Sequence, residues 1–282
     1  MPPNPFLDGA RRLRSGWWIG IFFVVLAGLL VPMLLLARGR GADVSPVQQL
    51  AVVLAASAIC QASRREPLPR LLGPLDRRWP REFLLGGLAG ALLMAVPALF
   101  LGLSGVVSWR PGAGGSAALW AELALLAAAA ATEELLFRGF LFRRLLDGLG
   151  TWPAQLLIAA LFVLTHSDAL RGLGSLAYLA GANLFLASIL FGLAYLRTRS
   201  LAMPFGLHLA ANVTQGPVLG FGVSGHEGAS LLVPVPSGAP DWLSGGKFGL
   251  EASVPGLVCV VGLLLGLRGW RRYRDAGPTR FL

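Results

Sequence analysis

Two neighbouring glutamates and an arginine stand out because they interrupt an apolar run. Glu133, Glu134 and Arg138 lie within residues 117–146, which are otherwise mostly apolar. A membrane-spanning helix needs about 20 consecutive, mostly apolar residues, so this run is predicted to cross a membrane. An ionisable side chain at membrane depth costs at least ~2.5–3.5 kcal/mol on insertion scales. The three residues are therefore candidates for a functional site.

The spacing of these residues predicts different roles for the two glutamates. Glu134 and Arg138 are four residues apart, so they share a helix face on which they can form an ion pair. Glu133 points about 100° away from Glu134 and has no obvious local partner. We therefore expect an ion pair to hold Glu134 and to leave Glu133 for another task. The alternative is a pair that serves only helix packing.

Two later apolar segments carry histidine and asparagine side chains that complete the candidate site. His166 ends the segment Phe-Val-Leu-Thr-His, and His208 begins the segment His-Leu-Ala-Ala-Asn, which ends at Asn212. His208 and Asn212 are four residues apart and should point together into the bundle. Each feature alone could be a helix–helix hydrogen bond. The third histidine, His226, lies in a polar loop and is expected at the surface.

These residue types suit the attack of water on an amide. A glutamate and a histidine can take a proton from water, while an asparagine and a second histidine can stabilise an oxyanion. The hydroxyls of Thr132 and Thr165 are expected to bond back to a helix carbonyl instead of acting as nucleophiles. Zinc is an alternative, since Glu133, His166 and His208 match a catalytic zinc set in type. The His-Glu-x-x-His spacing of many zinc proteases is absent.

The composition places the whole chain in a membrane. Its mean hydropathy is +0.67, and 55% of its residues are hydrophobic while only 13% are charged. A soluble globular chain carries about 25% charged residues. The apolar segments follow one another without a long polar insert, so we expect one all-α, polytopic membrane domain over residues 1–282. The net charge of +10 is almost all arginine between apolar segments, which indicates membrane topology and not nucleic-acid binding.

Eight apolar segments predict a bundle of about eight transmembrane helices. The second, fifth and sixth are short, and such short helices occur where neighbours cover them. The predicted spans are residues 16–37, 46–63, 82–104, 117–146, 152–169, 180–197, 201–223 and 250–269.

Successive loops are alternately rich and poor in arginine, and this pattern predicts the orientation of the chain in the membrane. Arginine-rich loops precede the first span and follow the second, fourth, sixth and eighth, whereas each of the other loops has one or two basic residues. By the positive-inside rule, both termini are predicted to be cytoplasmic and the loop 224–249 external, in a cell membrane. The residues used are Arg11, Arg12, Arg14, Arg64, Arg65, Arg70, Arg77, Arg78, Arg81, Arg143, Arg144, Arg197, Arg199, Arg268, Arg271, Arg272, Arg274 and Arg280, with Trp17, Trp18, Trp270 and Tyr273 as interfacial anchors.

With this orientation, the candidate residues are expected at similar depths in the membrane. With a rise of about 1.5 Å per residue, Glu133, His208 and His166 lie roughly 15, 10 and 20 Å above the cytoplasmic helix ends. We therefore expect one buried polar cavity that opens more easily to the cytoplasm. The loop 224–249, rich in Gly, Pro and Ser, is either an ordinary connection or a lid over the cavity.

Glycines and cysteines within the apolar segments give further information about how the helices pack. Gly86 and Gly90, four residues apart, indicate a close contact between helix backbones. Cys60 and Cys259 fall within apolar segments and indicate neither a disulfide nor a metal cluster. The first apolar run is longer than the core of a secretion signal, so we expect it to be retained.

Taken together, three of these patterns resemble the motifs of a known family, the CAAX protease and bacteriocin-processing family, also called CPBP or Abi. The resemblance covers residues 117–223, and no motif position departs from the family pattern. Each motif alone is weak, but the three in this order are specific. The motifs are Glu133-Glu134-x-x-x-Arg138, Phe162-x-x-x-His166 and His208-x-x-x-Asn212.

The resemblance implies an eight-helix intramembrane endopeptidase that cleaves near the cytoplasmic side of the membrane. The implied roles are general base for Glu133, activation of the same water for His166, an oxyanion hole for His208 and Asn212, and orientation of the site for Glu134 and Arg138. This scheme requires no metal, although family members were long labelled metalloproteases. The implied partners are membrane lipids and a peptide or lipidated-protein substrate; eukaryotic relatives remove three residues after a prenylated cysteine, and bacterial ones are linked to peptide maturation and immunity.

Two other classes of function fit the same residues. A non-catalytic membrane protein, such as an immunity protein, could use the cavity to hold a peptide and would tolerate single replacements of the motif residues. A proton-coupled transporter could use buried glutamate and histidine as a proton relay. The sequence shows neither repeated halves nor paired broken helices, which are typical of such transporters.

Overall fold

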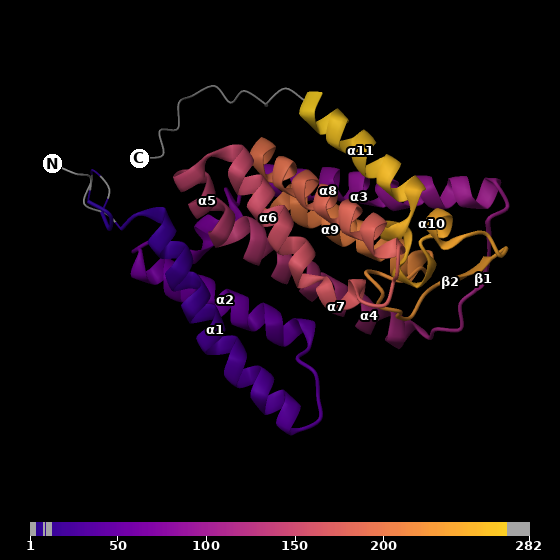
Figure 1. Cartoon of the computed structure of the whole chain (residues 1–282), viewed down its shortest axis with the longest axis horizontal. Helices are drawn as coiled ribbons and strands as arrows, with labels where there is room; N and C mark the ends of the chain where they lie inside the picture. The colour runs from indigo at the N-terminus through magenta and orange to yellow at the C-terminus, as the bar shows by residue number, and fades with distance from the viewer. Residues whose placement is uncertain (1–3, 8, 10–12, 270–282) are drawn as a thin grey trace.

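Helices make up most of the part of the chain that the structure describes. The computed structural model describes residues 4–7, 9 and 13–269 (Figure 1). Within these residues, helices coincide with all eight apolar segments, and only two short strands occur. The predicted fold class, an all-α membrane protein, is thereby confirmed. Several residues used for the predicted orientation lie outside the described residues, namely Arg11, Arg12, Trp270, Arg271, Arg272, Tyr273, Arg274 and Arg280.

Eight principal helices form the bundle, one for each predicted span. They are α1 (Ser15–Gly39), α2 (Pro46–Ser63), α3 (Arg78–Leu103), α4 (Ser116–Glu134), α6 (Thr151–Thr165), α8 (Leu176–Thr198), α9 (Ala202–Val213) and α11 (Val254–Gly269). By length and composition, α1, α2, α3 and α8 are the described helices that can cross a membrane, while α6 and α11 are shorter apolar helices. The remaining helical turns are η1 (Leu68–Leu72), η2 (Leu135–Leu141), α5 (Phe142–Leu149), α7 (Ser167–Leu170), η3 (Thr214–Val218), α10 (Asp241–Ser244), η4 (Gly246–Phe248) and η5 (Leu250–Ala252).

The fourth predicted span is not one regular helix. After α4 the chain forms the π-helical segment η2 and then α5, and a second π-helical segment, η3, follows α9. Single π-helical turns inside α-helices are rare overall, but many of those that occur lie at functional sites. In η3, Pro217 has no N–H to donate to a regular helix. Both π segments begin within two residues of a candidate site residue, Glu134 or Asn212.

A small sheet was not predicted from the sequence. Strands β1 (Val107–Pro111) and β2 (Leu232–Pro236) pair antiparallel, with Val107 opposite Pro236 and Pro111 opposite Leu232. Both strands of a two-stranded sheet are edge strands. A proline whose missing N–H would face away from the partner strand therefore removes no hydrogen bond between the strands. The sheet ties the loop 224–249 to the connection between α3 and α4, so this loop is not a free connection.

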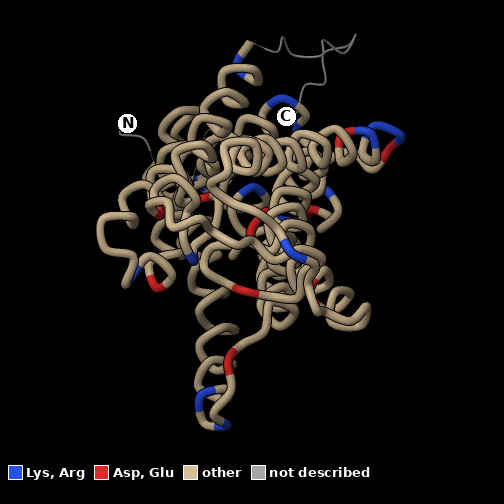
Figure 2. Tube along the Cα trace, turned by 90° about the vertical axis from the view of Figure 1, so that its right-hand side faces the viewer, with Lys and Arg blue, Asp and Glu red and all other residues tan. Residues whose placement is uncertain are grey.

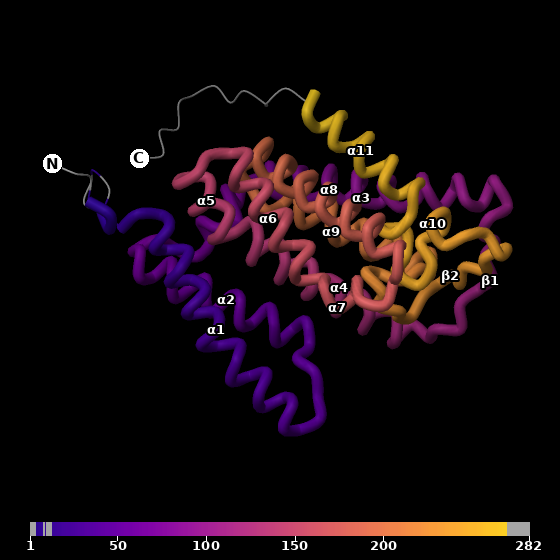
Figure 3. The backbone as a smooth tube through the Cα atoms, in the orientation of Figure 1, coloured from indigo at the N-terminus to yellow at the C-terminus, as the bar shows by residue number. Residues whose placement is uncertain are grey.

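The two ends of the bundle differ in composition. The arginine end consists of residues 61–78, 140–149 and 195–199, which border a common cavity with the start of α1. The loop end consists of residues 104–116, 166–176 and 219–253. Figures 1 and 3 show α5 and the start of α1 at the arginine end, and β1 and β2 at the loop end. Figure 2 shows long uncharged stretches of the trace, with the charged residues gathered in a few places.

Helices α3 and α9 approach each other backbone to backbone. A Cβ atom added at Gly86 would collide with the carbonyl oxygen of Met203, and one added at Gly90 with that of Leu207. From the other side, a Cβ at Gly206 would collide with the carbonyl oxygen of Phe83. The close contact predicted from Gly86 and Gly90 is therefore confirmed. It fixes the position of α9 directly beside His208 and Asn212.

Candidate active site

One buried cavity brings together four of the six predicted site residues. Glu133 from α4, His166 at the end of α6, and His208 and Asn212 from α9 all line a cavity of about 320 Å³. The other two, Glu134 and Arg138, are almost fully buried and do not border it. The six residues therefore form one site, with four facing the cavity and two behind it.

Glu134 is the centre of the buried part of the site. Its Oε1 atom accepts a hydrogen bond from Nδ1 of His208 at 2.9 Å and lies 3.3 Å from a terminal nitrogen of Arg138. The predicted ion pair between Glu134 and Arg138 is therefore present. The contact with His208 was not predicted, because it joins residues that are 74 positions apart. Glu134 thus connects the first motif to the third.

Arg138 is completely buried, and its surroundings match its charge. Its second terminal nitrogen donates to the carbonyl oxygen and to the hydroxyl of Ser188, each at 2.8 Å. The guanidinium also lies 5.3 Å from the ring centre of Phe162 and 5.2 Å from that of Phe191. A buried ion pair is tolerated only when further hydrogen bonds and close packing offset the loss of water. Arg138 therefore holds Glu134, and through it His208, in place.

The contact with Glu134 determines which proton His208 carries. An ionised carboxylate only accepts hydrogen bonds, so Nδ1 of His208 must donate to Glu134. The second ring nitrogen, Nε2, lies 3.8 Å from Oε2 of Glu133. Nε2 is therefore the ring nitrogen that faces Glu133, and a protonated His208 would donate from it into the cavity. The ring of His208 stacks on that of Phe191, with the ring centres 4.7 Å apart.

Glu133 differs from Glu134 in being available to a ligand. Its side chain is 27% exposed and faces the cavity. Its Oε2 atom is buried and has no hydrogen-bond partner among the described residues. Oε2 of Glu134 also lacks a partner there, but of the two glutamates only Glu133 lines the cavity, where water or a ligand could reach its carboxylate.

His166 is held by the end of its own helix. It follows the last residue of α6, and its Nδ1 lies 2.7 Å from the carbonyl oxygen of Phe162. Because a carbonyl oxygen accepts, Nδ1 must carry the proton, and Nε2 keeps its lone pair. The hydroxyls of Thr165 and Thr132 bond back to Phe162 and Ala128, as expected, at 2.8 and 2.7 Å. His166 is thus prepared to accept a proton, and the threonines are not.

Two asparagines line the cavity, and the sequence analysis identified only one. Asn212 on α9 and Asn183 on α8 are both buried, and the described residues provide no side-chain hydrogen bond to either. An amide in that situation can donate to a bound carbonyl. Asn183 is a polar residue inside the predicted span 180–197, and that signal could have identified it.

The mouth of the cavity lies at the loop end. Glu122 of α4 pairs with Nε2 of His226 at 3.2 Å, and Glu251 accepts from the backbone and hydroxyl of Ser224 at 2.8 and 2.9 Å. All four residues line the cavity. His226 is therefore more than a solvated surface residue, although 58% of its side chain is exposed. The start of the loop 224–249 therefore borders the cavity.

The location of the mouth conflicts with one of two predictions, the cavity that opens to the cytoplasm or the cytoplasmic termini. Toward the arginine end, the site is closed by buried apolar residues, among them Phe140, Leu141, Met203 and Leu207. The exposed lining residues belong to the loop end, which is the end opposite the start of α1. A cavity that opens to the cytoplasm and cytoplasmic termini are thus incompatible, because the two lie at opposite ends of the bundle. The depth estimate rested on residue counts and did not include which end the side chains seal.

Among the described residues, no group of three histidine, cysteine or acidic side chains lies close enough together to hold one metal ion. Cys60 and Cys259 are free thiols, as expected.

The geometry defines a class of protein, an all-α membrane protein with a partly exposed glutamate in a cavity. Beside this glutamate lies a buried cluster of a carboxylate, a guanidinium and an imidazole. Residues 115–214, about a third of the chain, match the family model named Rce1-like. Its description is "Type II CAAX prenyl endopeptidase Rce1-like". The match supports the resemblance to the CAAX protease and bacteriocin-processing family that the three motifs indicated, over the third of the chain that it covers. The comparison with curated proteins found no match.

Proposed function

We propose that the protein hydrolyses a peptide bond of a membrane-anchored peptide, with Glu133 as the general base. The observation that carries the proposal is the place of Glu133, which lines a cavity together with His166 and Asn212. Its Oε2 atom has no hydrogen-bond partner among the described residues and lies 3.8 Å from Nε2 of His208. A base, a second proton acceptor and two donors therefore surround one space.

The reaction begins with a water molecule in this cavity. Glu133, with Nε2 of His166, takes one proton as the water oxygen attacks the carbonyl carbon of the substrate. The carbonyl oxygen becomes an oxyanion, which accepts hydrogen bonds from the amide of Asn212 and from Nε2–H of His208. The C–N bond then breaks, and the proton held by Glu133 or His166 passes to the leaving amine. The products are a carboxylic acid and an amine.

Glu134 and Arg138 do not touch the substrate in this scheme. Their role is to orient His208, since Nδ1 of His208 is committed to Glu134. This leaves Nε2–H as the only ring donor that points into the cavity. Asn183 is placed to bind a second carbonyl of the peptide.

The lining of the cavity supports an apolar substrate. Besides the site residues, it includes Leu93, Leu125, Leu126, Leu184 and Val260. The matched family model is named for prenyl endopeptidases, whose substrates are lipidated. A peptide carrying a lipid, or a membrane-spanning peptide end, fits both observations. Cleavage is proposed at the membrane face that carries the loop end, which is the outer face if the termini are cytoplasmic.

Cleavage by the wild-type protein tests the function. The purified protein in lipid vesicles is given membrane-anchored peptides, prenylated and unprenylated, and products are read by mass spectrometry. We expect cleavage, and we expect it to continue after exhaustive chelation. Binding without cleavage would favour a non-catalytic binding protein. Activity that is lost to chelator and restored by zinc would place Glu133, His166 and His208 in ligand roles.

A further inference from the structure

A second, larger cavity lies at the arginine end, away from the candidate active site. Its volume is about 2390 Å³, and it is bordered by the ends of α2 and α8, by η1, by α5 and by the start of α1. Within the described residues, nine arginines and four carboxylates line it. The arginines are Arg14, Arg64, Arg65, Arg70, Arg78, Arg143, Arg144, Arg197 and Arg199. The wall of the cavity is therefore strongly positive.

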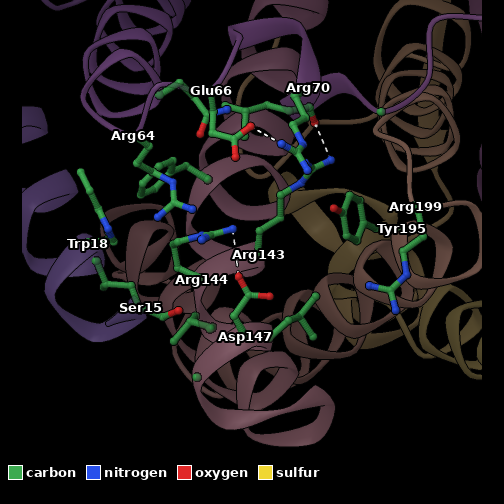
Figure 4. Close-up of a pocket in the computed structure, with 18 of the residues that line it drawn as sticks. Ser15, Trp18, Arg64, Glu66, Arg70, Arg143, Arg144, Asp147, Tyr195 and Arg199 are labelled. Atoms are coloured by element: carbon green, nitrogen blue, oxygen red, sulfur yellow. Dashed lines mark hydrogen bonds and ion pairs between the residues drawn. The ribbon is translucent and has the colours of Figure 1, made fainter. Parts of the chain in front are cut away.

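The centre of this cavity contains guanidinium groups from different parts of the chain. Figure 4 shows Arg64 and Arg144 pointing toward each other, and Arg70 and Arg143 meeting beside them. Arg144 pairs with Asp147 at 2.9 Å, and Arg70 pairs with Glu66. Gathering like charges in a partly buried place is unfavourable unless an anion compensates them. The carboxylates present are fewer than the guanidinium groups.

Arg143 shows most clearly that an acceptor is missing. One terminal nitrogen donates to the carbonyl oxygen of Leu71 at 3.4 Å, which is a long hydrogen bond. Its guanidinium also lies 5.8 Å from the ring centre of Tyr195. Its Nε atom is buried and has no partner in the part of the chain that the structure describes. Buried donors of this kind are normally satisfied, so a ligand oxygen is expected beside Arg143.

The surroundings of the arginines identify the chemistry of the ligand. The planar guanidinium fork matches the oxygens of a phosphate group. Apolar side chains of Leu71, Phe140, Leu145 and Leu196 also line the cavity, and Trp18 lies 5.1 Å below the guanidinium of Arg64. Tryptophan is typical of the membrane–water interface, and basic pockets between membrane helices bind anionic lipid headgroups.

We propose that this cavity binds the phosphate headgroup of an anionic membrane lipid, with Arg143 and Arg144 as its principal contacts and the acyl chains along the apolar wall. The ligand would join five segments that are distant in sequence, which are α1, α2, η1, α5 and α8. Binding therefore stabilises the folded bundle. Nothing in this proposal depends on the chemistry at Glu133.

Lipid selectivity of the wild-type protein is the first test. The purified full chain is placed in bilayers of phosphatidylcholine with or without phosphatidylglycerol, and retained lipid is identified by native mass spectrometry while unfolding is followed on heating. We expect phosphatidylglycerol to be retained at least about tenfold over phosphatidylcholine and to raise the unfolding temperature, as charge-assisted hydrogen bonds are among the stronger ones. Equal retention of the two lipids would overturn the proposal. Protection by inorganic phosphate without lipid selectivity would also overturn it.

A double variant assigns the binding to this cavity. Arg143→Gln with Arg144→Gln removes two charges from the cavity, and Arg38→Gln with Arg40→Gln removes two from the tip of the α1–α2 hairpin, outside it. We expect the first variant to retain phosphatidylglycerol about 10- to 100-fold less and the second to behave as wild type. Equal loss in both variants would mean that only overall charge matters. If the first variant does not fold, Arg144→Lys, which keeps the charge but not the fork, should still weaken retention.

Discussion

Glu133 and Glu134 are neighbours in the chain, but their surroundings differ. Glu134 is 1% exposed and receives hydrogen bonds from His208 and Arg138. Glu133 is 27% exposed and borders the cavity. The i,i+4 spacing of Glu134 and Arg138 was sufficient to predict the pair. The bond from Arg138 to Ser188 could not be predicted, because it depends on how α8 packs against η2.

Loss of Arg138 should destabilise the protein more than loss of its partner hydroxyl. Arg138→Ala removes the guanidinium from a buried ion pair and leaves Glu134 with His208 as its partner; breaking a buried pair typically costs about 3–5 kcal/mol. Ser188→Ala removes one hydroxyl contact and keeps the carbonyl, so about 1 kcal/mol is expected. Thermal unfolding in detergent measures both. If Arg138→Ala unfolds at the wild-type temperature but is inactive, Arg138 acts on the substrate and not as a support.

Helix α9 carries His208 and Asn212, and α3 determines where α9 lies. The apolar runs predicted every principal helix, and Gly86 and Gly90 predicted the contact. The π-helical segments and the β1–β2 pair were missed because both are set by tertiary contacts, such as the bond from Trp109 Nε1 to the carbonyl oxygen of Leu219 at 3.0 Å. Local periodicity contains no information about contacts of that kind.

An added methyl group at the α3–α9 contact should separate the two helices. A Cβ at Gly90 would meet the carbonyl oxygen of Leu207, one residue before His208. Gly90→Ala should therefore cost about 1–3 kcal/mol, as overpacking does, and should also lower activity. Gly87→Ala is the matched control, because the nearest atoms to its Cβ would be 3.9 Å away. Equal stability of the two variants, measured by thermal unfolding, would show that this contact does not position α9.

The described part of the molecule contains two separate cavities at opposite ends of the bundle. The smaller one opens at the loop end and contains Glu133, while the larger one lies at the arginine end. The sequence predicted the arginine end from loop charge alone. It could not predict that the active-site mouth lies at the opposite end, because the sealing side chains come from η2 and α9. The side of the membrane on which cleavage occurs thus depends on the orientation of the chain.

Cysteine labelling of the loop end determines this orientation. In a protein without Cys60 and Cys259, Gly238→Cys places a thiol at an exposed position beyond β2. A membrane-impermeant maleimide should label it from outside intact cells, since the arginines predict an external loop. The cavity of Glu133 would then open outward. Labelling only after the membrane is broken would instead place the cavity mouth in the cytoplasm and refute the prediction of cytoplasmic termini.

The most direct test of the account is peptide cleavage by the Glu133→Gln protein. The substitution keeps the shape of the side chain and removes the base, so turnover should fall by roughly 10²–10⁴-fold. Asp43→Asn, at an exposed carboxylate between α1 and α2, is the matched control and should cleave as wild type. Cleaved and bound membrane-anchored peptide are measured in the same vesicles by mass spectrometry. We expect Glu133→Gln to bind the peptide without cleaving it, and undiminished cleavage by that variant would contradict the role of Glu133 as the base.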